Sequence, residues 1–219
     1  MTGIWILILL VFISALPILP VFIWFRLSRF PLSLRWFLIS LAAGCAALLL
    51  AGFLQTLFSP QFGIDMGSVF LKLFIHVALT EEAGRLALLL LVLQFRRLSE
   101  PLPQDSLSFG AAAGLLAGLG FAVIETAAYG AADPSAPLLR AVTAAPLHGA
   151  CGCRVGLAAA SLPQSPFRAL AYFFNAVAVH GMYNFMTVSP GLPPVFSILL
   201  VFTALFSSIQ VIRRSANTG

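Results

Sequence analysis

Two adjacent glutamates, Glu81 and Glu82, stand inside an apolar stretch, residues 69–93, that is long enough to cross a lipid bilayer. Arg85 follows them one helical turn later. A charged side chain at membrane depth is costly unless it is paired or lines a polar cavity. A Glu–Arg pair that neutralises itself would be a structural feature only, but it would leave the second glutamate unexplained. The three residues therefore indicate a catalytic or transport site.

Glu125 is a third acid in an apolar segment, residues 107–130, with Phe121 one turn before it and Tyr129 one turn after it. Because the segment ends near Gly130, the acid belongs either to the same site or to the membrane interface. In the first case, Tyr129 would support it from the same face of the helix.

His148 begins a row at helical spacing, His148, Gly152 and Gly156, within residues 138–160. Such a row of small residues lets a neighbouring helix approach closely, and it would bring the histidine against that neighbour. Arg154 lies in the same segment, nearer to its expected cytoplasmic end. We interpret Arg154 as a structural counter-ion.

His180 and Asn184 are four residues apart within residues 168–188 and therefore share one helix face. A single histidine on an apolar helix is more often structural than catalytic, but two histidines on successive spans favour a functional site. His76 lies roughly 140° from Glu81 at about 100° per residue, so we expect it to face elsewhere.

The composition defines the setting of these residues. The chain has 219 residues, of which 60% are hydrophobic and only 9% are charged, and its mean hydropathy is +1.02. These values indicate an integral membrane protein with a single membrane-embedded domain, residues 1–219, whose motif core is residues 68–188. The formal net charge of +5 comes from basic residues at the ends of apolar segments. We therefore expect the lipid bilayer as a partner, and no nucleic acid.

Apolar segments of about 20 residues, separated by Pro and Gly, predict an all-α, polytopic membrane helix bundle with about seven transmembrane helices. The expected spans are residues 3–25, 34–57, 68–94, 107–130, 138–160, 168–188 and 192–212. Basic residues such as Arg96 and Arg97 then fall on one side, so the positive-inside rule predicts the N-terminus outside and the C-terminus in the cytoplasm. We predict a multi-pass protein of the cell (inner or cytoplasmic) membrane.

The expected depths of the acids and histidines agree with one another. At ~1.5 Å per residue, counted from the outer ends of the spans, Glu81 lies ~20 Å deep, His148 ~15 Å, His180 ~12 Å and Glu125 ~8 Å. We expect all four in the outer half of the bilayer, where they could line one cavity that opens to the outside.

With these residues identified, the chain resembles the PrsW family of intramembrane proteases, which is related to the larger group of CAAX prenyl proteases and bacteriocin-processing membrane proteases. The resemblance rests on four blocks in the family's order: Glu81-Glu82-x-x-Arg85, Phe121-x-x-x-Glu125 with Tyr129, His148 with its glycine row, and His180-x-x-x-Asn184. The chain departs from the family pattern at two positions. Arg85 stands where the family often has Lys, and Thr126 stands where Asn is common.

The resemblance implies hydrolysis of a peptide bond in a single-span membrane protein near its extracytoplasmic side, such as site-1 cleavage of an anti-sigma factor in stress signalling. Such a reaction needs a base for water, a group that stabilises the oxyanion and an acid for the leaving amine. We expect Glu81 or Glu82 to be the base, assisted by His148. His180 and Asn184 would hydrogen-bond the oxyanion.

Three further residues would support this site. Arg85 would orient the glutamate pair. Glu125, with Tyr129 beside it, would either hydrogen-bond and orient a catalytic side chain or contact the substrate backbone.

Two forms of chemistry fit these residues. A metal-free, glutamic-type form is favoured, because the sequence has no HExxH-type pairing and an asparagine suits an oxyanion role better than metal ligation. In the alternative form, zinc would be bound by Glu81, His148 and His180. Two other classes of function compete with proteolysis: a proton-coupled transporter, which predicts an inverted repeat that the sequence lacks, and a noncatalytic membrane scaffold.

Overall fold

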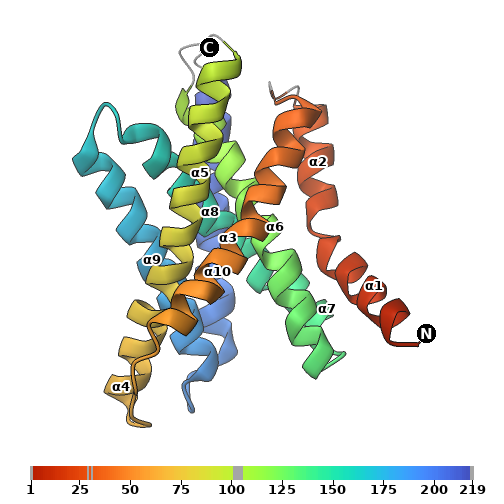
Figure 1. Ribbon diagram of the computed structural model, residues 1–219, viewed down its shortest axis with the longest axis vertical. Coiled ribbons are helices and arrows are strands. Elements are labelled where there is room, and N and C mark those ends of the chain that lie inside the picture. Colours follow the sequence, from red (N-terminus) through yellow and green to blue (C-terminus); the bar gives the residue numbers. More distant parts are fainter. Residues whose placement is uncertain (1, 29, 31, 101–105, 218–219) are drawn as a thin grey trace.

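The computed structural model describes residues 2–28, 30, 32–100 and 106–217. These residues form helices and no β-strand, so the predicted all-α class is confirmed (Figure 1). In chain order the helices are α1 (Thr2–Ala15), α2 (Ile18–Leu27), α3 (Leu34–Leu57), α4 (Met66–Leu71), the π-helix η1 (Lys72–Leu79), α5 (Thr80–Ser99), α6 (Ser106–Ala132), α7 (Ala136–Val142), α8 (Ala144–Ser161), α9 (Pro166–Val188) and α10 (Pro194–Asn217).

Helices long and apolar enough to cross a membrane occur three times in the described residues, at Leu34–Leu57, Leu107–Ala132 and Pro194–Arg214. A fourth span results if the pair Gly3–Ala15 and Ile18–Leu27, which is bent by 41°, is counted as one. The other three expected spans contain the ionisable residues described above. Seven crossings and the orientation of the termini stay predictions.

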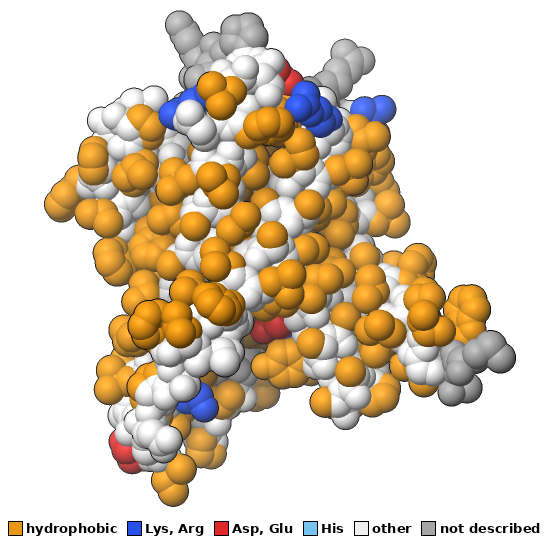
Figure 2. Space-filling view, in the orientation of Figure 1, with side chains coloured by type: hydrophobic (Ala, Val, Ile, Leu, Met, Phe, Trp, Pro, Cys, Tyr) orange, Lys and Arg blue, Asp and Glu red, His pale blue; other side chains and the backbone are white. Residues whose placement is uncertain are grey.

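The outer surface suits lipid rather than water. The flank seen in Figure 2 is largely apolar, and most of its Lys and Arg side chains gather at the end of the molecule where the C-terminus lies. Trp5, Leu49, Phe174 and Phe206 are among the large hydrophobic side chains that are more than half exposed. A water-soluble domain rarely exposes apolar surface on this scale. The protein is therefore a membrane protein.

The expected fifth span, residues 138–160, is divided at Thr143 into the short helix α7 and the longer helix α8. Pro146 lies in the first turn of α8 and has no backbone hydrogen to donate to the carbonyl of Val142, so one continuous helix would lose a hydrogen bond here. The break turns α7 back toward α6, and this places Arg140 near the site described below.

Helix α6 is the centre of the bundle and packs between α8 and α3. A Cβ atom on Gly114 would lie 2.1 Å from the carbonyl oxygen of Gly152, and one on Gly156 would lie 1.9 Å from that of Gly110. The two backbones therefore touch along facing glycines, which confirms the close helix approach predicted from the row on α8. The matching glycines of α6 were missed in the sequence.

The glutamate pair follows a change of helix type. Asp65 caps α4 through hydrogen bonds with Ser68, which lower the pKa of this exposed carboxyl. Eight residues of π-helix, η1, then lead into α5, and Glu81 and Glu82 lie in its first turn. π-Helical turns are uncommon and occur frequently at functional sites. His76 of η1 packs against the Phe62 ring, with the ring centroids 5.9 Å apart.

Candidate active site

Glu82 and Arg85 form a fully buried ion pair on the first turns of α5. The Nη1 atom of Arg85 contacts the Oε2 atom of Glu82, and the guanidinium lies over the Phe121 ring of α6, 4.5 Å from its centroid. The sequence predicted that Arg85 would orient the glutamate pair, and the structure pairs it with Glu82. Both neighbours are within reach on a helix, and the contact with Phe121 holds the guanidinium beside Glu82.

His180 of α9 meets Glu82 across the helix interface, with its Nδ1 atom 2.7 Å from the Oε1 atom of the carboxylate. A carboxylate paired with an arginine is a hydrogen-bond acceptor, so we assign the ring hydrogen to Nδ1. In the neutral ring, Nε2 then carries the lone pair. This hydrogen bond fixes the orientation of the imidazole.

Glu81 faces the other nitrogen of His180. The Oε2 atom of Glu81 is 3.6 Å from His180 Nε2 and, although buried, it has no hydrogen-bond partner in the described part of the chain. Its Oε1 atom is 3.5 Å from the Nε2 atom of Gln55 on α3, which also donates to Thr80 at 3.0 Å. Sequence reasoning missed Gln55, although an amide in an apolar span is itself a signal.

His148 of α8 connects the two halves of the site. Its Nδ1 atom is 3.4 Å from the Nη2 atom of Arg85, and its Nε2 atom is 2.7 Å from the Oε2 atom of Glu125. Arginine is only a donor, so Nδ1 accepts and Nε2 donates its hydrogen to Glu125. The His148 ring lies edge-on to that of His180, with centroids 4.9 Å apart, and 5.0 Å from the Phe121 ring.

Glu125 is held by two partners, His148 and Arg140 of α7, whose Nη2 atom donates to its Oε2 atom at 2.6 Å. Tyr129 does not contact Glu125 through a hydrogen bond; its ring lies under the Arg140 guanidinium at 4.0 Å. Thr126 accepts a hydrogen bond of 3.4 Å from Arg140 Nε. Sequence reasoning missed Arg140, because a basic residue at the end of a span is usually interpreted as a determinant of membrane orientation.

Asn184 is the one predicted catalytic residue that the structure does not join to the others. It lies one turn beyond His180 on α9 and is half-buried. Its backbone carbonyl accepts a hydrogen bond of 2.8 Å from Thr187, and its side-chain amide makes no hydrogen bond within the described residues.

The charges of the site do not balance. The acid–histidine cluster consists of Glu81, Glu82, Arg85, Glu125, Arg140, His148 and His180. Glu82 and Glu125 each have an arginine partner, whereas Glu81 has none among the described residues. Buried charges are ordinarily paired or bind metals. Glu81 is therefore the carboxylate of the cluster that is suited to take up a proton or a cation.

The five helices that carry this cluster, α5 to α9, lie within the part of the chain that a known family matches. A model described as the PrsW family of intramembrane metalloproteases matches residues 31–209. The chain belongs to the PrsW family. Membership makes it an intramembrane protease and confirms the resemblance drawn from the four sequence blocks. No curated protein and no solved structure shows a significant match to the chain.

Three residues of the cluster could hold a metal ion, in keeping with the description of the PrsW family as metalloproteases. Glu81, His148 and His180 are buried, and each offers one ligand atom within 4.8 Å of the others. Zinc binds such nitrogen and oxygen atoms at about 2.0–2.2 Å. The Glu82 carboxylate behind His180 is the usual companion of a ligating histidine.

Two of the three residues fit a metal without any change. Glu81 Oε2 and His180 Nε2 are acceptors that face each other, whereas both ring nitrogens of His148 already have partners. His148 would have to release Arg85 or Glu125 to ligate a metal. The donor set therefore fits a metal ion, with one ligand that must first be freed.

The cluster is nearly closed to the exterior. The side chain of Glu125 is 19% exposed and that of Glu81 9%, while those of His148 and His180 are 2% exposed. Figure 2 shows acidic side-chain surface recessed within the apolar flank of the molecule. Glu125, Arg140 and, to a smaller extent, Glu81 are thus the members of the cluster that reach the surface of this PrsW protein.

Proposed function

We propose that this protease is an endopeptidase that hydrolyses a peptide bond in a single-span membrane protein, with Glu81 as the base that activates water. One observation carries the proposal: the buried Oε2 atom of Glu81 has no hydrogen-bond partner in the described chain and faces His180 Nε2 at 3.6 Å. A water molecule bound to both acceptors would donate one hydrogen to each. Of the two glutamates that the sequence left open, Glu82 is occupied by Arg85 and His180.

The remaining residues have roles that follow from their contacts. Glu81 takes a proton from water, the water oxygen bonds to the scissile carbonyl carbon, and the proton passes to the leaving amine as the peptide bond breaks. Glu82 keeps His180 oriented through its Nδ1–H bond. We assign the oxyanion to Asn184, whose side-chain amide makes no hydrogen bond to other described residues. His180 becomes a second donor to the oxyanion only when its Nε2 atom takes up a proton, because its Nδ1 hydrogen is already donated to Glu82.

A metal-dependent form of the same protease is the second candidate. It is supported by the charge imbalance at Glu81 and by the three ligand atoms that lie within 4.8 Å of one another. Glu81, His148 and His180 would hold the ion. When bound, a zinc ion would polarise the scissile carbonyl as a Lewis acid. We rank the metal-free form first because both nitrogens of His148 are already hydrogen-bonded.

For the substrate we propose a membrane-anchored protein with one span, such as an anti-sigma factor, cleaved near its extracytoplasmic side in the inner membrane. The family resemblance and the position of the cluster within an apolar bundle support this class. The cluster belongs to helices surrounded by large exposed hydrophobic side chains, so a substrate that arrives through the lipid meets it more readily than a soluble peptide.

Reconstitution into lipid vesicles with a single-span substrate tests the proposal. The wild-type protein is compared with Glu81→Gln, Glu82→Gln and His148→Ala, and peptide products are identified by mass spectrometry. We expect cleavage by the wild type and its loss in Glu81→Gln. Cleavage that survives all three substitutions would refute the site. If no substrate panel yields cleavage, a transporter or scaffold function is favoured instead.

Metal analysis of the same active preparation separates the two forms. We expect less than 0.1 equivalent of zinc per chain, an order-of-magnitude bound for a site without a resident metal, and cleavage that persists after dialysis against a chelator. The metal-free mechanism is refuted if the preparation contains one zinc ion per chain, if removing the zinc abolishes cleavage and if adding zinc restores it. The protease is then metal-dependent.

A further inference from the structure

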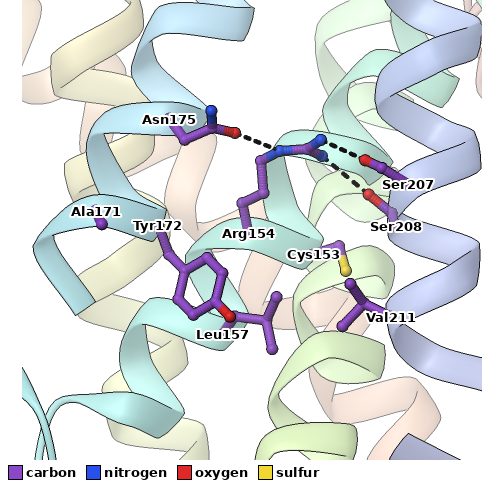
Figure 3. Close-up of a pocket in the computed structure, with 9 residues that line it drawn as sticks. All are labelled: Cys153, Arg154, Leu157, Ala171, Tyr172, Asn175, Ser207, Ser208 and Val211. Atoms are coloured by element: carbon purple, nitrogen blue, oxygen red, sulfur yellow. Dashed lines mark hydrogen bonds between the residues drawn. The ribbon is translucent and has the colours of Figure 1, made fainter. Parts of the chain in front are cut away.

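A second charged centre lies around Arg154 of α8, away from the acid–histidine cluster. Arg154 follows His148 by six residues, which corresponds to about 9 Å along a helix. Its guanidinium donates to the Asn175 side chain of α9 at 2.7 Å, and to Ser207 and Ser208 of α10 at 2.6 and 2.9 Å (Figure 3). It also reaches the backbone carbonyl of Ala150 at 2.9 Å.

All these partners are neutral. The sequence suggested a structural counter-ion, but no carboxylate within the described ranges forms an ion pair with Arg154. The buried Arg85 and the partly buried Arg140 each face a glutamate, so Arg154 differs from both. A partly buried cation in an apolar bundle is stabilised by an anion more than by neutral acceptors alone.

The guanidinium borders a cavity of about 350 Å³ between α8, α9 and α10. A water molecule in the liquid takes about 30 Å³, so this volume has room for roughly ten groups of that size. Figure 3 shows Arg154 reaching across the cavity from α8, with Asn175 on one side and the two serines on the other. Apolar side chains, among them Leu157 and Ala171, complete the wall.

Hydrogen-bond donors remain available at this cavity. Nη2 of Arg154 has two hydrogens and donates one of them, to Ser207. The side-chain amide nitrogen of Asn175 and the hydroxyl of Tyr172 donate to no acceptor among the described residues, and both residues line the cavity. These three donors lie beside the positive charge of Arg154, which has no carboxylate partner among the described residues. An anion with several acceptor oxygens fits such a set of donors.

The surroundings of the cavity favour an anion that carries hydrocarbon. On α9 the neighbouring side chains of Leu170 and Phe174 are exposed, and on α10 so are those of Phe202 and Phe206. A ligand would therefore enter from the lipid side, where phospholipid phosphates and acyl chains are abundant. Basic pockets between membrane helices are known places for anionic lipid headgroups.

We propose that the Arg154 pocket binds the phosphate group of an anionic phospholipid. Arg154 donates to the phosphate oxygens through its second Nη2 hydrogen, Asn175 and Tyr172 supply further donors, and the acyl chains leave over the apolar wall. The site is independent of the proteolytic chemistry, because it shares no residue with the acid–histidine cluster. Free inorganic phosphate offers the same chemistry without hydrocarbon.

The test uses the full chain purified in mild detergent and measured by native mass spectrometry. Phosphatidylglycerol, phosphatidylcholine or inorganic phosphate is added, and the fraction of lipid-bound protein is counted. The variants are Arg154→Gln and Ala171→Leu, which leaves Arg154 intact but narrows the cavity. Arg168→Gln is the matched control, because Arg168 is an exposed cation at the start of α9 outside the pocket.

We expect one phosphatidylglycerol to be retained by the wild type and by Arg168→Gln. Retention should fall at least fivefold in Arg154→Gln and in Ala171→Leu. Equal retention in all variants, or equal retention of phosphatidylglycerol and phosphatidylcholine by the wild type, would overturn the proposal. If inorganic phosphate displaces the lipid at millimolar concentration and alone raises the unfolding temperature in an Arg154-dependent way, the site takes phosphate from water rather than from lipid. If Arg154→Gln does not fold, Ala171→Leu decides the result.

Discussion

The Nε2 atom of His180 lies 3.6 Å from the Oε2 atom of Glu81, and the opposite nitrogen of the same ring is held by Glu82 at 2.7 Å. One imidazole thus stands between two carboxylates with different roles. Glu82 is paired with Arg85 and fixes the ring, whereas Glu81 has no arginine or lysine partner among the residues that the structure describes. Glu81 Oε2 and His180 Nε2 are both acceptors, so a proton or a cation bound between them is stabilised. A water molecule bound there can give up a proton to Glu81, which makes the water oxygen a nucleophile.

The two glutamates should respond differently to the same substitution. Glu81→Gln removes the base and should lower the cleavage rate by about 10²–10⁴-fold, with little effect on stability, because no ion pair is lost. Glu82→Gln leaves Arg85 buried without its carboxylate and should cost about 3–5 kcal/mol of stability. Cleavage of a reconstituted substrate and thermal unfolding in detergent measure the two effects. An unfolding temperature lowered equally by both substitutions would contradict these roles.

The histidines provide a matched pair. His180→Ala should abolish cleavage, since it removes the group that faces Glu81. His76→Ala should retain it, because His76 packs against the Phe62 ring and not against the cluster. Both variants are assayed in vesicles at equal protein density. Loss of cleavage in both would show that the assay reports general damage to the bundle and not the proposed site.

Arg140 should act through Glu125. Arg140→Gln removes the cation that holds this carboxylate at 2.6 Å. We expect the cleavage rate to fall by about tenfold to hundredfold, as it does when the residues that hydrogen-bond and orient active-site side chains are substituted. Arg140→Lys should restore part of the rate. The control is Lys72→Gln, which removes an exposed cation at the start of η1. An unchanged rate in Arg140→Gln would exclude Arg140 from the site.

The glycine contact between α6 and α8 should position His148. A Cβ atom on Gly118 would lie 1.9 Å from the backbone carbonyl oxygen of His148. Gly118→Ala should therefore push α8 away, lower the unfolding temperature and abolish cleavage. Gly52→Ala is the control, because nothing lies within 4 Å of its added Cβ. Alanine there should be neutral or stabilise the helix by up to about 1 kcal/mol. Similar unfolding temperatures for the two variants would contradict the packing argument.

Parts of the site could be predicted from spacing alone, and other parts could not. Helical periodicity correctly put Glu81, Glu82 and Arg85 together on a few turns of one helix, but it could not choose between two carboxylates that are both within reach of the arginine. Arg140 joined the site only because α7 breaks away from α8 at Thr143. Gln55 contacts Glu81 from a span in which nothing else marks a functional position.

Hydropathy and helical periodicity are read along the chain, so they already indicate an apolar, helical membrane protein and the ionisable residues that lie inside it. Which of these residues meet depends instead on the three-dimensional packing of the helices. His180 and Glu82 are 98 positions apart, and His148 and Arg85 are 63 positions apart. Their contacts depend on how each helix is rotated and how closely the glycine-bearing backbones approach. Those quantities are set by packing between helices, which no local pattern encodes.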